Sequence, residues 1–158
     1  DTDCGIKWCN DVVLHGKKLC GILTESSLLP DGSAAWLVVG IGVNVGQASF
    51  PPDIADMATS LALQELDVSL DALADAILAQ LTAMRTVLTD PVEWLVEYRR
   101  RCVNLGRPVR VLRGNTVRQA TALAIDEQFG LTVQYENGET ETVRSGEVSV
   151  RGLYGYIE

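Results

Sequence analysis

The sequence has little of what several common kinds of protein site require. Among its 158 residues there is a single histidine, His15, and the four cysteines include no C-x-x-C pair. A zinc site is therefore not expected, because zinc needs several such ligands at close spacing. No apolar run approaches the ~18 residues that cross a bilayer, so no membrane segment is predicted. The longest apolar run, residues 34–39, has the length of a strand.

An excess of positive charge is also missing. The net charge is −8, which argues against a nucleic-acid-binding surface, because phosphate binding requires clustered positive charge. The one basic cluster, Arg99-Arg100-Arg101, falls at the end of an expected helix, where cations interact favourably with the helix dipole.

What the sequence does contain is the composition of a folded, soluble protein. Hydrophobic residues make up 47% of it and charged residues 22%. The aliphatic content can build a core without disulfide bonds, and no signal peptide is visible, so we expect a cytoplasmic protein. The chain begins at Asp1 and runs almost directly into a motif, from which we expect that an upstream portion exists.

Two parts follow one another along the chain and predict an α+β protein. Residues 1–105 mix strands and helices, as in a mixed α/β domain in which helices pack on a sheet. Residues 106–158 alternate short strands with glycine turns, which is typical of a small β-barrel.

In the first part, residues 15–18 read as a hairpin turn between strands at 12–14 and 19–25, followed by a loop at 26–33. Residues 34–41 are almost continuously apolar, which predicts a strand buried on both faces. Leucines and other apolar residues recur at helical spacing over residues 70–88, after Ser69 as N-cap. A second helix is predicted with Asp90 as N-cap, Pro91 at its first position and Glu93 completing a capping box. Gly106 is expected to end it. Its predicted inner face consists of Trp94, Leu95, Tyr98 and Cys102.

In the second part, turns are predicted at Gly114-Asn115 and Asn137-Gly138. Strands are predicted at residues 121–125, 131–135 and 147–151.

Three polar or glycine-rich clusters in the first part could carry chemistry. They are Lys7-Trp8-Cys9-Asn10-Asp11, Lys17 to Leu23 with its Gly21, and the glycine-rich run from Gly40 to Gly46. We expect them at strand ends, where α/β proteins gather ligand-binding groups. Each has a simpler alternative: a turn around a packed tryptophan, a solvated lysine, and a tight exit turn. The third cluster fits neither the dinucleotide-binding fingerprint nor a Walker loop.

Taken together and in order, the clusters resemble the biotin–protein ligase family, whose catalytic domain carries K-W-P-N-D, K-L-x-G-I-L and G-I-G-x-N. The matching residues are Lys7 to Asp11, Lys18 to Leu23 and Gly40 to Asn44. Residues 58–61 match another family stretch. Residues 146–151 resemble the G-E-[IV]-S-[LV]-R of the family's SH3-like carboxyl-terminal domain, and the likeness covers nearly the whole chain.

The resemblance implies a ligase that joins biotin and ATP into biotinyl-5′-AMP, with Mg²⁺, and transfers biotin to a lysine of biotin carboxyl carrier protein. It implies that Lys18 contacts biotin and the α-phosphate and that Lys7 adds charge. It assigns the nucleotide and metal to Asn10 and Asp11, with Asp11 as a Mg²⁺ ligand. It also assigns the biotin and adenylate pocket to Gly21, Ile22, Gly40, Ile41 and Gly42, the adenine to Asn44, and the triphosphate to Glu147 and Arg151.

Two departures from the family pattern matter. Cys9 stands where the family has proline, which leaves the backbone of this loop less fixed and puts the position of Asn10 in doubt. The family's glycine- and arginine-rich biotin loop is absent from the sequence, as is any DNA-binding segment. We therefore predict that these 158 residues alone neither bind biotin tightly nor form the adenylate.

Two other functions stay open. The chain could be a non-catalytic module whose barrel docks a carrier protein, or a degenerate ligase fragment without activity. Family members often dimerise through this sheet, so residues 34–41 could also pair between two subunits.

Overall fold

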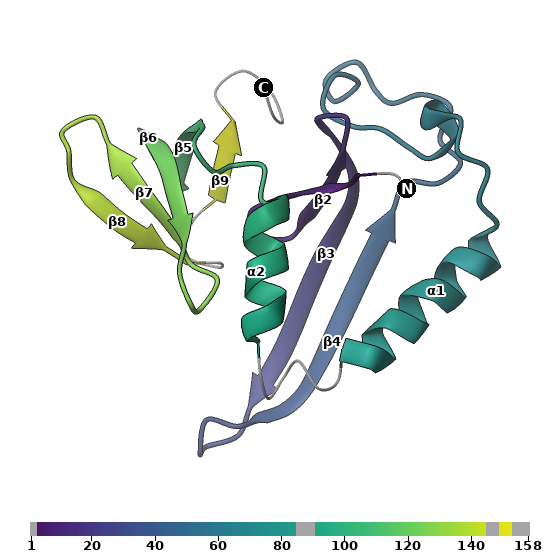
Figure 1. Cartoon of the computed structure of the whole chain (residues 1–158), viewed down its shortest axis with the longest axis horizontal. Coiled ribbons are helices and arrows are strands. Elements are labelled where there is room, and N and C mark those ends of the chain that lie inside the picture. The colour runs from purple at the N-terminus through teal and green to yellow at the C-terminus, as the bar shows by residue number, and fades with distance from the viewer. Residues whose placement is uncertain (1–2, 85–90, 145–148, 153–158) are drawn as a thin grey trace.

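A computed structural model describes residues 3–84, 91–144 and 149–152. Its described residues form two antiparallel sheets and two α-helices (Figure 1). The first sheet belongs to the first part of the chain and the second sheet to the last part, and helix α2 lies between them. The α+β class is confirmed in this form. The first part is not a parallel sheet with crossover helices, because all of its strand pairs are antiparallel.

The first sheet is a meander of four strands in chain order: β1 (Gly5–Lys7), β2 (Asp11–Leu14), β3 (Lys17–Leu28) and β4 (Ala34–Val43). The hairpin turn between β2 and β3 is confirmed, with φ of 48° at His15 and 77° at Gly16. Two successive left-handed residues are what a tight two-residue hairpin turn requires. The loop predicted at 26–33 is shorter than expected, because β3 continues to Leu28.

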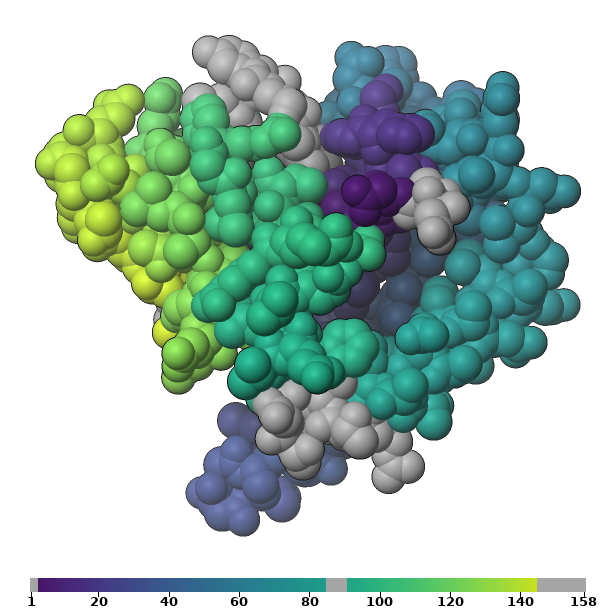
Figure 2. All heavy atoms as spheres, viewed as in Figure 1, coloured from purple at the N-terminus to yellow at the C-terminus, as the bar shows by residue number. Residues whose placement is uncertain are grey.

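The prediction that residues 34–41 are buried on both faces is wrong for the described structure. Trp36, Leu37 and Val38 are 52%, 55% and 55% exposed. The reason is that the far half of the β3–β4 hairpin extends beyond the other described elements, so these side chains are left half-exposed within the part of the chain that the structure describes. Figure 2 shows this hairpin, in blue, projecting from the lower edge of the molecule.

Helix α1 (Leu70–Ala83) begins where predicted, and the Oγ of Ser69 accepts a hydrogen bond from the N–H of Ala72. It ends at Ala83, earlier than residue 88, and residues 85–90 lie outside the described structure. The helix packs on the first sheet only lightly. No residue of α1 is fully buried, although Leu73 contacts the small core of Leu14, Leu19 and Leu61.

Helix α2 (Val92–Arg101) differs from the prediction at its start. Pro91 itself occupies the N-cap position and no side chain caps the helix; Asp90 is outside the described residues. On the predicted inner face, Leu95 and Cys102 are buried, whereas Trp94 stays 38% exposed. No described helix is both long and apolar enough to span a membrane.

The second sheet has the strand order β8-β7-β6-β5-β9. Its strands are β5 (Pro108–Arg113), β6 (Thr116–Ile125), β7 (Leu131–Tyr135), β8 (Thr140–Val143) and β9 (Ser149–Gly152). The turns at Gly114 and Gly138 are confirmed, with φ of 55° and 83°. Among the described residues β8 and β9 are edge strands that do not pair with each other, so the sheet is open and a closed SH3-like barrel is not confirmed.

The two parts share a core through Trp8. This residue follows β1, yet its ring is buried among apolar residues of α2 and the second sheet. Its backbone N–H donates to Oδ1 of buried Asn104 over 2.7 Å, and its Nε1–H donates to the carbonyl of Phe129 over 2.8 Å. The segment that carries Cys9, Asn10 and Asp11 is therefore anchored, through Trp8, to Asn104 and to the second part of the chain.

Candidate functional site

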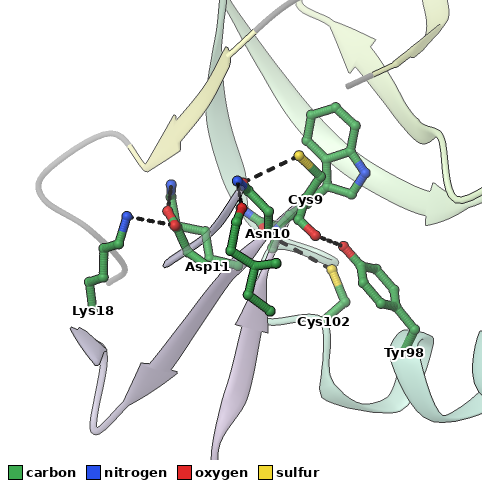
Figure 3. A network of polar contacts seen from close by, with 10 residues as sticks. Cys9, Asn10, Asp11, Lys18, Tyr98 and Cys102 are labelled. Carbon is green, nitrogen blue, oxygen red and sulfur yellow. Dashed lines mark hydrogen bonds and ion pairs between the residues drawn. The ribbon is translucent and has the colours of Figure 1, made fainter. Parts of the chain in front are cut away.

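The clearest polar site is a carboxylate between two lysines. Oδ1 of Asp11 lies 2.6 Å from Nζ of Lys18, and Oδ2 of Asp11 lies 3.5 Å from Nζ of Lys7. Lys7 is buried, whereas the side chain of Lys18 is 39% exposed. Figure 3 shows the Lys18 and Asp11 side chains pointing toward each other. Two ammonium groups around one carboxylate give the cluster a net positive charge. Lys18 is the more solvent-accessible of the two lysines.

Strand register builds this cluster. Lys7 is paired with Asp11 across β1 and β2, and Asp11 with Gly21 across β2 and β3. Residues that are directly paired lie on the same face of a sheet. The cluster thus lies on one face of the antiparallel sheet. The expectation that it sits at strand ends is confirmed, because Lys7 ends β1, Asp11 begins β2 and Lys18 is the second residue of β3.

Beside the cluster, the same face carries glycine instead of side chains. Gly21 is paired with Gly42 across β3 and β4, and Gly40 lies two residues from Gly42 on the same face. A Cβ added at Gly42 or Gly40 would have backbone oxygens as its nearest neighbours, 3.8 and 3.7 Å away, so it would fit on this face at ordinary van der Waals distance. The three glycines form a floor of bare backbone on which a flat ligand can lie next to Lys18.

Gly21 has a further role in this arrangement. A Cβ built on it would lie 3.0 Å from Nζ of Lys18 and 3.1 Å from its Cε, with Oδ1 of Asp11 at 3.5 Å. Any side chain at position 21 would therefore occupy the space in which Lys18 reaches Asp11. Because glycine has no Cβ, the Lys18 side chain can pass over position 21 and reach Asp11.

The backbone of Lys18 is fixed from the other side by residues 57–59. The N–H of Lys18 donates to Met57 O over 2.8 Å, and the N–H of Thr59 donates to Lys18 O over 2.9 Å. Nδ2 of Asn44 donates to the carbonyls of Lys18 and Thr59 at 3.4 and 3.0 Å. Asn44 thus links the glycine-rich run to β3. This is a structural role, in addition to the contact with adenine that the resemblance implies.

The loop around Cys9 is well held although proline is missing there. The hydroxyl of Tyr98 donates to the carbonyl of Cys9 over 2.9 Å, and Sγ of Cys9 lies 3.4 Å from Oδ1 of Asn10 (Figure 3). Nδ2 of Asn10 donates to the carbonyl of Ile22. Asn10 therefore fastens the loop to β3. These hydrogen bonds restrain the loop, as the fixed φ of the family's proline would otherwise do at position 9.

Some expected site residues are not brought to this face. Ile22 and Ile41 are paired with each other, one residue along from Gly21 and Gly42, so their side chains point to the opposite face of the sheet. The backbone of Arg151 pairs with Arg110 in the second sheet, and Glu147 lies outside the described residues. Their expected reach toward a triphosphate therefore stays a prediction.

The expectation that Asp11 binds Mg²⁺ does not fit the geometry. Both carboxylate oxygens face lysine ammonium groups, which compete directly with a cation. Among the described residues no group of three or more histidine, cysteine or acidic side chains could hold a metal ion. Asp11 serves here to orient and neutralise lysines, and no chemical step is assigned to a metal.

Sequence reasoning missed the residues that hold the site in place. Asn104, Tyr98 and Phe129 anchor the loop that carries Asn10 and Asp11, from 89 or more positions away in the sequence. Asn104 is buried, and a buried amide needs a partner, but its burial depends on the fold and gives no signal in the sequence.

Comparisons with known proteins agree with this geometry. Residues 1–44 match the family model of the "Biotin/lipoate A/B protein ligase family", and residues 105–151 match the "Biotin protein ligase C terminal domain". The biotin–[acetyl-CoA-carboxylase] ligase of Mycobacterium tuberculosis is 34% identical over 93% of this chain and 53% of its own length. The chain thus spans about half the length of the curated ligases it matches over nearly all of its residues.

Solved structures show the same fold. The apo biotin protein ligase of Aquifex aeolicus superposes with a TM-score of 0.79 at 27% identity, over 94% of this chain and 65% of that chain. The Aquifex aeolicus ligase in complex with biotin and ATP superposes with a TM-score of 0.77 at 26% identity, over 94% of this chain and 62% of that chain. The order of the motifs, the sheet that carries them and both family models lead to one conclusion: the chain belongs to the biotin protein ligase family.

Proposed function

We propose that this chain supplies the lysine-bearing half of the adenylation site of a biotin protein ligase. The whole enzyme would join biotin to ATP, giving biotinyl-5′-AMP and pyrophosphate, and pass biotin to a lysine of biotin carboxyl carrier protein. The observation that carries the proposal is the Lys7–Asp11–Lys18 cluster beside the floor of Gly21, Gly40 and Gly42.

In the first step the biotin carboxylate attacks the α-phosphorus of ATP. One P–O bond forms to biotin, and the P–O bond to pyrophosphate breaks. Two anions must meet, so the barrier depends on fixed positive charge near the phosphoryl oxygens. Lys18 supplies that charge from its exposed ammonium, and Asp11 fixes its direction. Loss of one such group costs about 3 kcal/mol or more.

In the second step the amine of the carrier lysine attacks the carbonyl carbon of the adenylate. A C–N bond forms, the C–O bond to AMP breaks, and the amine loses a proton. Lys18 again faces the negative charge, now on the departing AMP phosphate. The glycine floor keeps side chains away from the ligand, so the adenylate can lie close to the sheet.

The activity requires more chain than these residues provide. The matched curated ligases are about twice as long, and the sequence lacks the glycine- and arginine-rich biotin loop of the family. We propose that the complete site includes that loop and a closed carboxyl-terminal barrel with Glu147 and Arg151 near the triphosphate. We also propose a cytoplasmic location.

The test uses a fusion protein. The portion of the Aquifex aeolicus ligase that precedes the matched region is joined ahead of residue 1, and biotin- and ATP-dependent pyrophosphate release is measured. We expect release from the fusion and none from the 158 residues alone. A folded fusion without release, or a chain that instead binds carrier protein and ignores both substrates, would contradict the proposal and favour a binding module.

A further inference from the structure

The loop of residues 8–10 lies between two members of the Lys7–Asp11–Lys18 cluster. Lys7 ends β1 directly before the loop, and Asp11 begins β2 directly after it. The position of the Asp11 carboxylate therefore depends on how the backbone of the loop is oriented. Because Oδ1 of Asp11 lies 2.6 Å from Nζ of Lys18, the direction of that ammonium group depends on the same loop.

Strand β3 and helix α2 both hold this loop. The N–H of Ile22 in β3 donates to the carbonyl of Asn10 over 2.9 Å, and Nδ2 of Asn10 donates to the carbonyl of Ile22. From α2, the hydroxyl of Tyr98 donates to the carbonyl of Cys9 over 2.9 Å (Figure 3). The Cys9 carbonyl and the Asn10 nitrogen belong to one planar peptide group. The Tyr98 hydroxyl therefore fixes the plane through which the chain enters Asn10.

The Tyr98 hydroxyl is itself held in place by apolar packing. The Tyr98 ring meets the Phe129 ring edge to face, with centroids 5.3 Å apart and planes at 89°, and both rings pack against the core of the second sheet. The carbonyl of Phe129 accepts a hydrogen bond from Nε1 of Trp8, so the same residue contacts the first residue of the loop. Burial raises the pKa of Tyr98, which keeps the hydroxyl protonated as a hydrogen-bond donor. The donor that meets the loop is therefore pre-organised.

We propose that Tyr98 is a positioning residue for adenylation, which acts through the Cys9 carbonyl on Asp11 and so on Lys18. The inference rests on the proposed function, because it requires Lys18 to stabilise the phosphoryl group. A charge directed at a reacting group is sensitive to displacements of about 1 Å. The glycine floor is formed by the pairing of β3 with β4, so loss of the hydroxyl leaves it in place. The effect of Tyr98 therefore falls on the chemical step and not on substrate binding.

The test measures steady-state pyrophosphate release by variants of the fusion protein that each lack one hydroxyl group. Tyr98→Phe removes the hydroxyl and keeps the ring. We expect kcat to fall about tenfold, while the KM values for biotin and ATP change less than about twofold. Tyr135→Phe is the matched control, because the Tyr135 hydroxyl donates to Glu141 within the second sheet, over 2.6 Å. It should keep the kcat of the parent, and urea unfolding checks that both variants are folded.

A second substitution separates positioning from support of the fold. Proline restrains the backbone at position 9 by its ring, without the Tyr98 hydroxyl. Cys9→Pro added to Tyr98→Phe should therefore recover most of the lost kcat, whereas Cys9→Pro alone should change the kcat of the parent little. Hydrogen exchange measures the loop itself. Residues 8–11 should exchange severalfold faster in Tyr98→Phe than in Tyr135→Phe, and slowly again in the double variant.

Other outcomes overturn the inference. Equal kcat values for Tyr98→Phe and Tyr135→Phe would do so, as would a higher KM with kcat unchanged. A folded double variant without recovery would show that the hydroxyl does not act through Cys9. If the double variant does not fold, equal exchange of residues 8–11 in the two single variants overturns the inference. A parent fusion protein without pyrophosphate release counts against the proposed function, and the exchange rates then still decide whether Tyr98 holds the loop.

Discussion

Replacement of Gly21 by alanine tests how the sheet positions Lys18. The added Cβ would lie 3.0 Å from Nζ and 3.1 Å from Cε of Lys18, closer than ordinary van der Waals contact. Because the neighbour is the end of a flexible side chain, the lysine swings away and the strand stays in place. The 2.6 Å ion pair with Asp11 is then weakened, and the ammonium is displaced from its position beside Gly21.

The expected cost falls on activity and hardly on stability. Displacement of a charge-stabilising group by about 1 Å can cost ~100-fold in rate, so we expect a decrease of about tenfold to 100-fold. Stability should change by less than about 1 kcal/mol, because alanine is favoured over glycine in a strand by roughly 0.5–1 kcal/mol and the weakened ion pair is partly exposed.

The assay is pyrophosphate release by the fusion protein, with urea unfolding measured in parallel. Gly46→Ala is the control, since a Cβ at Gly46 meets nothing within 4 Å. If Gly21→Ala were as active as Gly46→Ala, the explanation given for Gly21 would be refuted.

Two further predictions concern the framework of the molecule. Asn104→Ala should lower the free energy of unfolding by about 1–3 kcal/mol in urea titration, because it leaves the buried N–H of Trp8 without its acceptor; an unchanged midpoint would contradict the anchoring role. Burial raises the pKa of Asp126, but hydrogen bonds from the N–H groups of Gly130 and Gln128 outweigh it and hold the pKa below the ordinary 3.8. A carboxyl group with a lowered pKa stabilises the fold above its unfolded-state pKa and loses that contribution as pH falls through its folded-state pKa. The stability difference between the parent and Asp126→Asn should therefore be largest near neutral pH and shrink toward pH ~2; a difference independent of pH would contradict it.

Local signals predicted much of the fold. The turns at His15-Gly16 and Asn137-Gly138 and the Ser69 cap depend on residues next to one another, and all three are confirmed. The length of β3 and the start of β6 at Thr116 depend on hairpin pairing, of Leu28 with Ala34 and of Thr116 with Arg113, which the residue pattern alone did not predict. The apolar run at 34–41 predicted burial that these residues do not provide by themselves.

The candidate site was predictable in composition but only partly in arrangement. Lys7, Asp11 and Lys18 were recognisable from their types and spacing, and the structure brings them together. The placement of Ile22 and Ile41 on the opposite face follows from the two-residue period of a strand, once the register of Gly21 with Gly42 is known. That register depends on residues 21 positions apart in the sequence. The packing of Trp8 against the second sheet likewise depends on residues far away in the sequence, so neither could be predicted from local patterns.

The central claim is that the Lys18 ammonium, held by Asp11 over the glycine floor, stabilises the phosphoryl group during adenylation. The most direct measurement is biotin-dependent pyrophosphate release by the fusion protein carrying Lys18→Met, compared with the fusion protein carrying Lys17→Met. Lys17 is the matched control because its Nζ donates to the carbonyl of Ala55 instead of facing Asp11. We predict a loss of about 100-fold or more for Lys18→Met and a much smaller change for Lys17→Met, with both proteins folded. Equal activity of the two variants would contradict the account.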